Sequence, residues 1–334
     1  QGEVMMIETL IEVDVNKSAE EQADVIHNRW HPDIPMTRMV KPGDEFRIQC
    51  LDWTGGQISN DDSATDIRDV DLTKVHYLSG PIGVEGAEPG DLLVVDILDV
   101  GVLPESAWGF TGLFARENGG GFLTEHYPDA RKACWDYSGI FASSRHIPHV
   151  RFPGTMHPGL IGCLPSAELL STWNKREKAL VATDPDRVPE LATLPHAPTA
   201  MGDIHFSQGD GEITFCGAIE MAGYLDIRVN VIKGGMEKYA VVNPIFKPSK
   251  VDPNYSDYLI FEGISVDEDG KQYYLDAHVA YRQACLNAIA YMKKFGYTGA
   301  QAYAILGTAP VEGHISGIVD IPNACATLWL PTGI

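Results

Sequence analysis

The sequence has few cysteines, and none of the six lies in a Cys-x-x-Cys pair. Cysteines spaced this widely exclude a zinc ribbon and a dense disulfide scaffold, and they fit reduced thiols. No apolar run is long enough to span a bilayer. Residues 1–10 also lack the basic start and continuous apolar stretch of a secretion signal. We therefore expect a cytoplasmic globular protein with no membrane partner.

Basic residues are scarce as well. Lysine and arginine number 25 against 46 aspartates and glutamates, which gives a net charge of −21 over 334 residues. Such a surface repels phosphate backbones and anionic headgroups, so we expect no nucleic-acid partner. The sequence contains no Walker loop, no Gly-x-Gly-x-x-Gly after a strand, no Gly-x-Ser-x-Gly and no His-Glu-x-x-His. Phosphate transfer, dinucleotide chemistry and the common serine-hydrolase and zincin sites are therefore unsupported.

Turn-forming residues are abundant. Glycine (33) and proline (21) together make up about one residue in six, which favours a β-rich fold over a helical bundle. Two Pro-Gly-Asp turns, Lys41–Asp44 and Glu88–Asp91, each precede an apolar strand pattern, at 45–53 and 92–100. The sequence predicts an α+β fold, predominantly β, with sandwich- or barrel-like sheets and late helices.

The patterns divide the chain into three portions. Within the first we expect 101–165 to be irregular, because it shows no clear periodicity. Two helices are predicted near the end, over 277–295 and 299–306, with Asp276 and Thr298 as their N-caps. The portions are a β-rich N-terminal part with long loops (1–165), a helix from Ala167 to about Leu180 and a linker (166–200), and an α+β part with a β-hairpin and two helices (201–334).

The segment 202–212 holds the strongest chemical signal. Asp203 and His205 are two residues apart, so in a strand they share one face. Asp210-Gly211 suits a tight hairpin turn between strands 203–207 and 212–221, which would return Asp210, Glu212 and Glu220 toward the histidine. Such a set suits a divalent cation or an acid–base pair. Asp-Gly also forms turns without any function, and exposed strand faces often carry acids.

Two further histidine motifs are candidates. His27 and His31 have the i, i+4 spacing of metal ligands on a helix, but Pro32 and Pro35 favour a loop in which one imidazole only bonds to backbone. His157 precedes a glycine-rich apolar stretch in which Gly159 would let backbone amides approach a ligand.

These segments resemble the acetamidase/formamidase family, and closely its formamidase branch. The likeness covers nearly everything from Met6, and its blocks agree in order. The matching blocks are 27–32 (HNRWHP), 52–56 (DWTGG), 79–91 (SGPIGVEGAEPGD), 157–165 (HPGLIGCLP), 202–212 (GDIHFSQGDGE) and 216–220 (CGAIE).

The resemblance implies hydrolysis of the C–N bond of a small amide, formamide first, to a carboxylate and ammonia. It also implies a largely β fold with an α+β portion, homo-oligomers, and a divalent metal in at least some members. A γ-lactamase acting on a cyclic amide would look much the same. One departure is that a family segment with a His-Gly-Gly-Asn run is missing between Ala200 and Met201. We expect that this sequence omits the segment, rather than that the protein has lost it.

For the reaction we assign Asp203, His205 and Asp210 to a divalent metal, Zn²⁺ or Ca²⁺. His205 thereby also becomes a catalytic residue, because its metal would activate the attacking water. Glu212 or Glu220 would take the proton of that water and pass it to the leaving nitrogen.

His157, Gly159 and His27 would bind the substrate. A narrow, dry pocket is expected, because formamide is very small. A carboxylate nucleophile without metal fits the same residues. A reading of another class is a non-catalytic β-sandwich binding module with a structural Ca²⁺.

Overall fold

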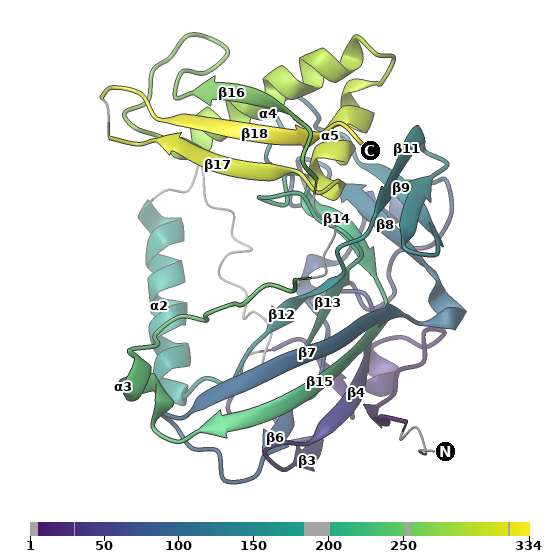
Figure 1. The fold of residues 1–334 in the computed structure, drawn as a ribbon, viewed down its shortest axis with the longest axis vertical. Helices are drawn as coiled ribbons and strands as arrows, with labels where there is room; N and C mark the ends of the chain where they lie inside the picture. The colour runs from purple at the N-terminus through teal and green to yellow at the C-terminus, as the bar shows by residue number, and fades with distance from the viewer. Residues whose placement is uncertain (1–5, 30, 184–200, 251–254, 320) are drawn as a thin grey trace.

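A computed structural model describes residues 6–29, 31–183, 201–250, 255–319 and 321–334. The expected fold class is confirmed, because most of the regular structure is β and the long helices near the end of the chain pack together (Figure 1). Four sheets form in this part of the chain, and none of them closes into a barrel.

The elements follow one another in this order. The strands are β1 (Glu8–Ile11), β2 (Ile26–His27), β3 (Arg38–Val40), β4 (Glu45–Cys50), β5 (Leu78–Ser79), β6 (Ile82–Val84), β7 (Leu92–Val102), β8 (Trp108–Leu113), β9 (Arg131–Ser138), β10 (Phe141–Ser144), β11 (Ile147–Pro153), β12 (His157–Ile161), β13 (Met201–His205), β14 (Phe215–Met221), β15 (Gly223–Ile232), β16 (Tyr258–Ile264), β17 (Glu312–Gly317) and β18 (Cys325–Pro331). The α-helices are α1 (Thr65–Arg68), α2 (Ala167–Thr183), α3 (Gly235–Tyr239), α4 (Ala277–Lys293) and α5 (Gly299–Thr308).

Both Pro-Gly-Asp turns begin strands of one sheet, as predicted. Asp44 accepts a hydrogen bond from the backbone N–H of Lys41 at 2.7 Å, and Asp91 accepts one from Glu88 at 2.8 Å. These turns lead into β4 and β7, which pair on either side of β15 in the order β1-β4-β15-β7. β15 is therefore an inner strand of this sheet, with a neighbouring strand on each side.

The largest sheet contains most of the stretch that we expect to be irregular. Residues 101–165 supply β8 to β12, so that expectation is wrong. The order is β11-β10-β9-β8-β14-β13-β5-β2, with β12 paired to β13. Strands such as β9 have a run of buried residues instead of alternation, because other layers cover them. Periodicity alone does not detect a strand of this kind.

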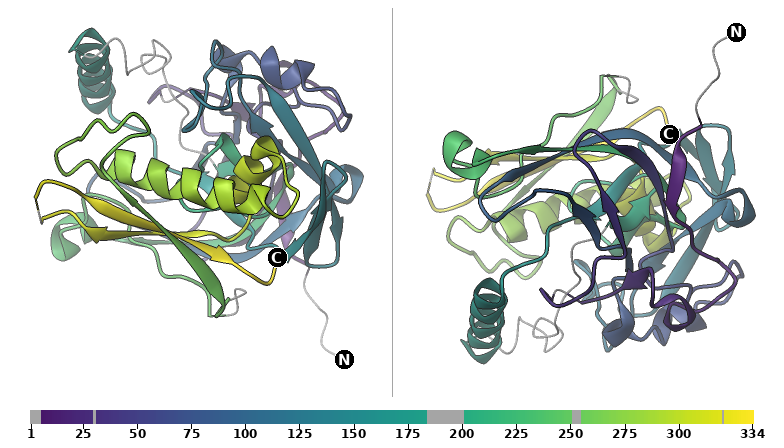
Figure 2. Two further views of the ribbon diagram at one scale, coloured as in Figure 1. Left: turned by 90° about the horizontal axis from the view of Figure 1, so that it is seen from above. Right: turned by 90° about the horizontal axis from the view of Figure 1, so that it is seen from below.

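The C-terminal layer consists of α4, α5 and the sheet β16-β18-β17 (Figures 1 and 2). Both predicted N-caps are confirmed: Asp276 accepts from the N–H of Val279, and Thr298 forms a capping box with Gln301. At Gly263 an added Cβ would lie 2.1 Å from the carbonyl oxygen of Ala280. Glycine is therefore required for α4 to lie directly against β16.

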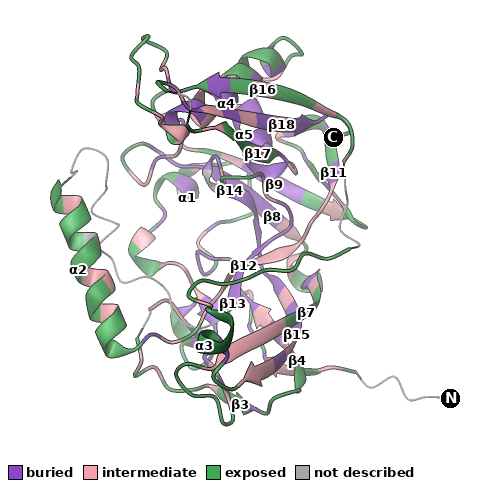
Figure 3. Ribbon diagram, turned by 60° about the vertical axis from the view of Figure 1, so that its left-hand side comes forward, coloured by how far each residue is buried: buried purple, intermediate pink, exposed green. Residues whose placement is uncertain are grey.

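The middle helix, α2, follows Ser166, whose hydroxyl accepts a hydrogen bond from the N–H of Leu169. The helix extends slightly beyond the predicted end, and it stands apart from the body with a largely exposed surface (Figure 3). The predicted linker after it lies outside the described residues. Among the residues described, no helix has both the length and the apolar character that crossing a bilayer requires.

Candidate active site

Strand β13 lies at the centre of the site because it pairs with three neighbours. His205 is opposite His157 of β12 and opposite Glu220 of β14, and Gly202 is opposite Leu78 of β5. Directly opposed residues in a sheet present their side chains to the same face. The pairing therefore brings together side chains that are far apart in the sequence.

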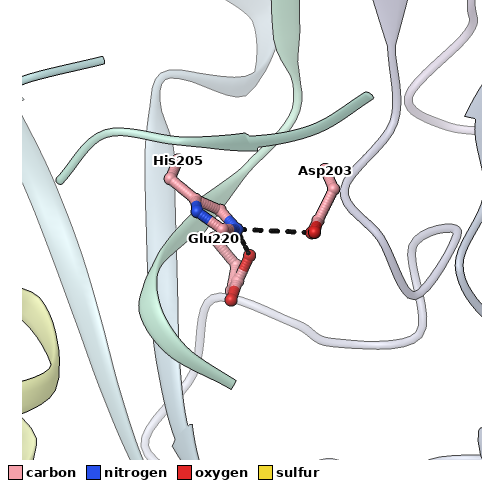
Figure 4. A group of neighbouring side chains, drawn as sticks. All are labelled: Asp203, His205 and Glu220. Atoms are coloured by element: carbon pink, nitrogen blue, oxygen red, sulfur yellow. Dashed lines mark ion pairs between the residues drawn. The ribbon is translucent and has the colours of Figure 1, made fainter. Parts of the chain in front are cut away.

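Three buried side chains form a compact group, Asp203, His205 and Glu220 (Figure 4). The Nε2 atom of His205 is 2.9 Å from Oε2 of Glu220 and 3.3 Å from Oδ1 of Asp203. The three residues are 8%, 1% and 2% exposed in chain order. An imidazole that lies between two carboxylates and is almost completely buried is common at metal-binding and acid–base sites.

Asp210-Gly211 forms the predicted turn, closed by a hydrogen bond from the N–H of Glu212 to the carbonyl of Gly209 at 3.1 Å. The hairpin as a whole is looser than predicted: β13 ends at His205 and β14 begins at Phe215, so the turn lies within a longer connection. Asp210 is not a member of the compact group, and its Oδ2 accepts a hydrogen bond from the N–H of Gly313 at 2.8 Å. The structure therefore does not place Asp210 among the proposed metal ligands, because its carboxylate is hydrogen-bonded to β17.

Glu212 does return to the site. Its Oε1 lies 3.8 Å from Nε2 of His205, and its side chain is 40% exposed. Asp203 and Glu212 both have positive φ angles, 55° and 43°. This conformation is strained for residues with a side chain, and it is found mainly where the surrounding structure holds a functional group in place.

The charges of the group act strongly on one another. Burial alone would raise the pKa of Asp203, but the neighbouring imidazoles of His205 and His76 outweigh it and hold this pKa below its ordinary range. Burial raises the pKa of Glu220. Burial would lower the pKa of His205, yet the attraction of Glu220 and the bond to Asp203 raise it well above the usual value. The carboxylates thus require nearby positive charge.

His76 and Gln208 complete the site, and neither was predicted. Nδ1 of His76 lies 3.7 Å from Oδ2 of Asp203, and its ring packs on Trp53 with 4.8 Å between centroids. Gln208 Oε1 lies 2.7 Å from Nδ1 of His205, which assigns the proton to Nδ1 and directs Nε2 at the carboxylates. No sequence pattern marks His76, because it reaches Asp203 only through the pairing of β5 with β13.

His157 and Gly159 also lie beside the group. The rings of His157 and His205 meet edge to face, with centroids 5.0 Å apart. A Cβ at Gly159 would stand 2.5 Å from the carbonyl oxygen and 2.6 Å from Oδ2 of Asp203. The glycine thus allows β12 to approach the Asp203 carboxylate itself, whereas we had expected an approach to substrate.

His27, the third predicted substrate-binding residue, lies elsewhere. It is in β2, and β5 separates that strand from β13. No described contact links it to the Asp203 group, and its Nε2 is buried without a hydrogen-bond partner. Burial lowers the pKa of His27 to about 4. His27 is therefore packed among its neighbours in β2, and within the described residues no contact connects it with Asp203, His205 or Glu220.

The shifted pKa of His27 predicts a pH-dependent stability. The unfolded imidazole binds a proton near pH 6.5 and the folded one only near pH 4, so the free energy of unfolding should fall as the pH drops through this window. Because the side chain is only half-buried, we expect a loss of about 1–2 kcal/mol. Denaturant titrations at pH 7 and pH 4 should show this loss reduced in His27→Gln. An equal pH dependence in both proteins would contradict the prediction.

A cavity of about 970 Å³ opens beside the buried group. Glu212 and His76 line it, so it reaches the group at these two residues. Most of the remaining wall is apolar or aromatic, including Trp53, Phe122 and Tyr281. This space is wider than the narrow pocket that we expect for formamide, and residues from both ends of the chain line it.

The buried group fits a divalent cation. His205 Nε2 and Glu220 Oε2 are close, yet neither has a hydrogen-bond partner of acceptable geometry, and Nδ1 of His76 is also unpartnered. Buried polar atoms in this state are costly unless an ion or water satisfies them. One ligand atom from each of Asp203, His205 and Glu220 lies within 4.8 Å of the others.

A β-rich fold with a buried acid–imidazole centre beside an open cavity is the architecture of a small-molecule enzyme. The sequence model of the acetamidase/formamidase family matches this chain over residues 12–201 and 193–334. The formamidase of Methylophilus methylotrophus is 62% identical, with 98% of this chain and 94% of the relative covered. The acetamidase of Mycolicibacterium smegmatis is 52% identical, with 92% of this chain and 91% of that relative covered. This chain belongs to the acetamidase/formamidase family.

A solved structure supports the same relationship. The γ-lactamase from Delftia acidovorans superposes with a TM-score of 0.93 at 58% identity, covering 98% of this chain and 93% of that one. The alignment with the M. methylotrophus formamidase spans 381 residues, more than the 334 of this chain, so the relative has residues without a counterpart here. The two stretches of family match meet at 193–201, immediately before and at the start of β13.

Proposed function

We propose that this chain hydrolyses the C–N bond of small amides such as formamide, giving a carboxylate and ammonia. Relatives named formamidase and acetamidase, at 62% and 52% identity, support this activity. The observation that carries the proposal is the buried Asp203–His205–Glu220 group, placed where Glu212 joins it to a cavity. An amide is a weak electrophile, and its hydrolysis needs both electrophilic assistance and a proton carrier.

Asp203, His205 and Glu220 are the residues that would hold a divalent cation. The imidazole nitrogen favours a transition metal such as Zn²⁺, whereas Ca²⁺ takes six to eight oxygen ligands. A cation bound there supplies Lewis-acid polarisation of the amide carbonyl and acidifies water. This assignment gives Glu220, which is almost fully buried, a binding role, and it leaves proton transfer to Glu212.

The chain's own residues perform the remaining tasks. Glu212 is half-exposed at the cavity, so it can take the proton from the attacking water and return it to the leaving nitrogen. Burial, with repulsion from Asp203, raises the pKa of Glu212, which makes it a stronger base. Gln208 holds His205 in one tautomer, and His76 orients Asp203.

A second candidate activity is the opening of a γ-lactam ring. Two observations favour it, the likeness to the D. acidovorans γ-lactamase and a cavity with room for a cyclic body. The bond and the catalytic groups are the same as for a linear amide. Only the fate of the nitrogen differs, because it stays attached as an amine.

The test measures hydrolysis and metal content on one preparation. Ammonia release from formamide and acetamide, and formation of the amino acid from a γ-lactam, are followed in protein whose metals are determined by elemental analysis. We expect turnover that falls after chelation and returns with Zn²⁺. Full turnover by metal-free protein would contradict the metal assignment. Protein that contains Ca²⁺ and hydrolyses none of the three would support the alternative of a binding module.

A further inference from the structure

The turn that carries Glu212 to the site is held by the C-terminal layer. This turn, 209–212, lies between β13 and β14 and outside the ladder that the two strands form. The N–H of Gly209 donates to the carbonyl of Gly307, near the end of α5, at 2.8 Å. A Cβ at Gly209 would lie 2.1 Å from the carbonyl oxygen of Leu306, so glycine is required for the turn to lie directly against this helix.

Asp210 is bonded to the same layer through its backbone and its side chain. Its N–H donates to the carbonyl of Val311, in the segment that joins α5 to β17, at 3.0 Å. Its carbonyl accepts from the hydroxyl of Tyr281 on α4 at 3.0 Å, and its carboxylate accepts from the N–H of Gly313 on β17 at 2.8 Å. Hydrogen bonds of ordinary length thus attach this one residue to three separate parts of the layer.

Glu212 has a backbone conformation that needs such support. Its φ is 43°, and Gly211 before it has a φ of 91°. A residue with a side chain stays in this region only where the surrounding structure imposes it. The ring of Tyr281 lies against the turn, because a Cβ at Gly211 would be 3.3 Å from its Cε1. A turn released from the layer would relax and carry the Glu212 carboxylate away from His205, whose Nε2 now lies 3.8 Å from it.

We infer that Asp210 and Tyr281 are positioning residues, which hold Glu212 at the reacting atoms by fixing its turn on the C-terminal layer. This inference rests on the proposed function, in which Glu212 carries the proton. Proton transfer requires hydrogen-bond reach, so a displacement of the carboxylate by about 1 Å lowers the rate by up to about 100-fold. The loss falls on kcat and leaves metal binding intact, because no member of the buried group lies in the turn.

The test measures kcat and KM for formamide, together with metal content, in two variants of Asp210. Asp210→Ala should lower kcat about tenfold or more, while KM changes less than about threefold and the metal is retained. Asparagine keeps a carbonyl oxygen that can accept from the N–H of Gly313, so Asp210→Asn should recover most of this loss. A metal ligand would behave differently, because an amide in place of the carboxylate weakens metal binding.

Two further variants test the partner on α4 and provide a control. Tyr281→Phe removes only the hydroxyl that donates to Asp210, and it should lower kcat by about threefold or more. The matched control is Asp44→Ala, which also removes a carboxylate that accepts from a turn N–H, that of Lys41 at 2.7 Å. Asp44 is not among the described residues that line the cavity, so kcat should stay unchanged.

A double-mutant cycle separates positioning from a general weakening of the fold. In Glu212→Gln the positioned side chain no longer carries a proton, so adding Asp210→Ala should lower kcat by less than about twofold. A purely structural defect would lower kcat by the same factor in both backgrounds. Thermal midpoints of all variants show which of them are weakened.

The outcomes separate this inference from the proposed function. Unchanged kcat in Asp210→Ala, or equal losses in the two backgrounds of the cycle, overturns the positioning role and leaves the amidase activity standing. Loss of metal in Asp210→Asn makes Asp210 a ligand and also overturns it. If folded, metal-loaded wild-type protein hydrolyses neither formamide, acetamide nor the γ-lactam, the proposed function itself is wrong and the positioning role is wrong with it.

Discussion

Replacing His205 with alanine is expected to remove both the bound divalent ion and the amidase activity. His205 is the nitrogen donor between Asp203 and Glu220, at 3.3 and 2.9 Å. Without it, two buried carboxylates face each other with no cation between them, and their affinity for a metal falls. We expect kcat/KM for formamide to drop at least about 10³-fold, equivalent to about 4 kcal/mol of transition-state stabilisation. Ammonia release and elemental analysis measure the two losses.

A folding defect must be separated from a loss of site chemistry. Removing one member of a buried charged group destabilises proteins by about 3–5 kcal/mol, so the thermal midpoint of His205→Ala should be recorded as well. His31→Ala is the matched control, because this side chain is exposed and, within the described part of the chain, its side-chain partner is the neighbouring Asp33. A folded His205→Ala protein that keeps its metal and its turnover would refute the role assigned to His205.

Glu212→Gln is expected to separate catalysis from metal binding. The glutamine keeps the size of the side chain but cannot accept the proton of the attacking water. Glu212 lies outside the compact group, 3.8 Å from His205 Nε2, so the metal should remain bound. We expect kcat to fall about 10²–10⁴-fold, the contribution typical of a general acid–base residue. Steady-state kinetics and metal analysis on the same sample give the two readouts.

The control for this variant is Glu168→Gln, which removes an exposed carboxylate on α2 and should change neither kcat nor metal content. Loss of metal in Glu212→Gln would identify this residue as a ligand and move proton transfer to another group. Unchanged kcat with metal retained would exclude Glu212 from the reaction.

Much of the local structure was predictable because its causes lie within a few residues. Asp276 and Thr298 cap α4 and α5 as predicted, since a cap needs only a side-chain oxygen near the next N–H groups. The two Pro-Gly-Asp turns begin β4 and β7 for a similar local reason. The spacing of Asp203 and His205 indicated that both lie on one face, and they are close in the structure.

Other predictions failed where long-range pairing decides the outcome. Asp210-Gly211 forms the predicted turn, but β14 begins only at Phe215, and Asp210 bonds to Gly313, about a hundred residues further along the chain. Residues 101–165 appeared irregular because strands such as β8 and β9 have runs of buried residues in place of alternation, and β12 has no fully buried residue at all. His76 was missed because only the pairing of β5 with β13 brings it to Asp203.

The amino-acid sequence by itself determined the helix ends, the turns, the β-rich class and an acid–histidine pair on one strand, since each depends on neighbouring residues. Tertiary structure alone decided which carboxylates surround His205, that Asp210 bonds to Gly313, and which residues line the cavity. The physical reason is that strand pairing joins segments with no local relationship, and burial then sets the charge state of the groups it brings together.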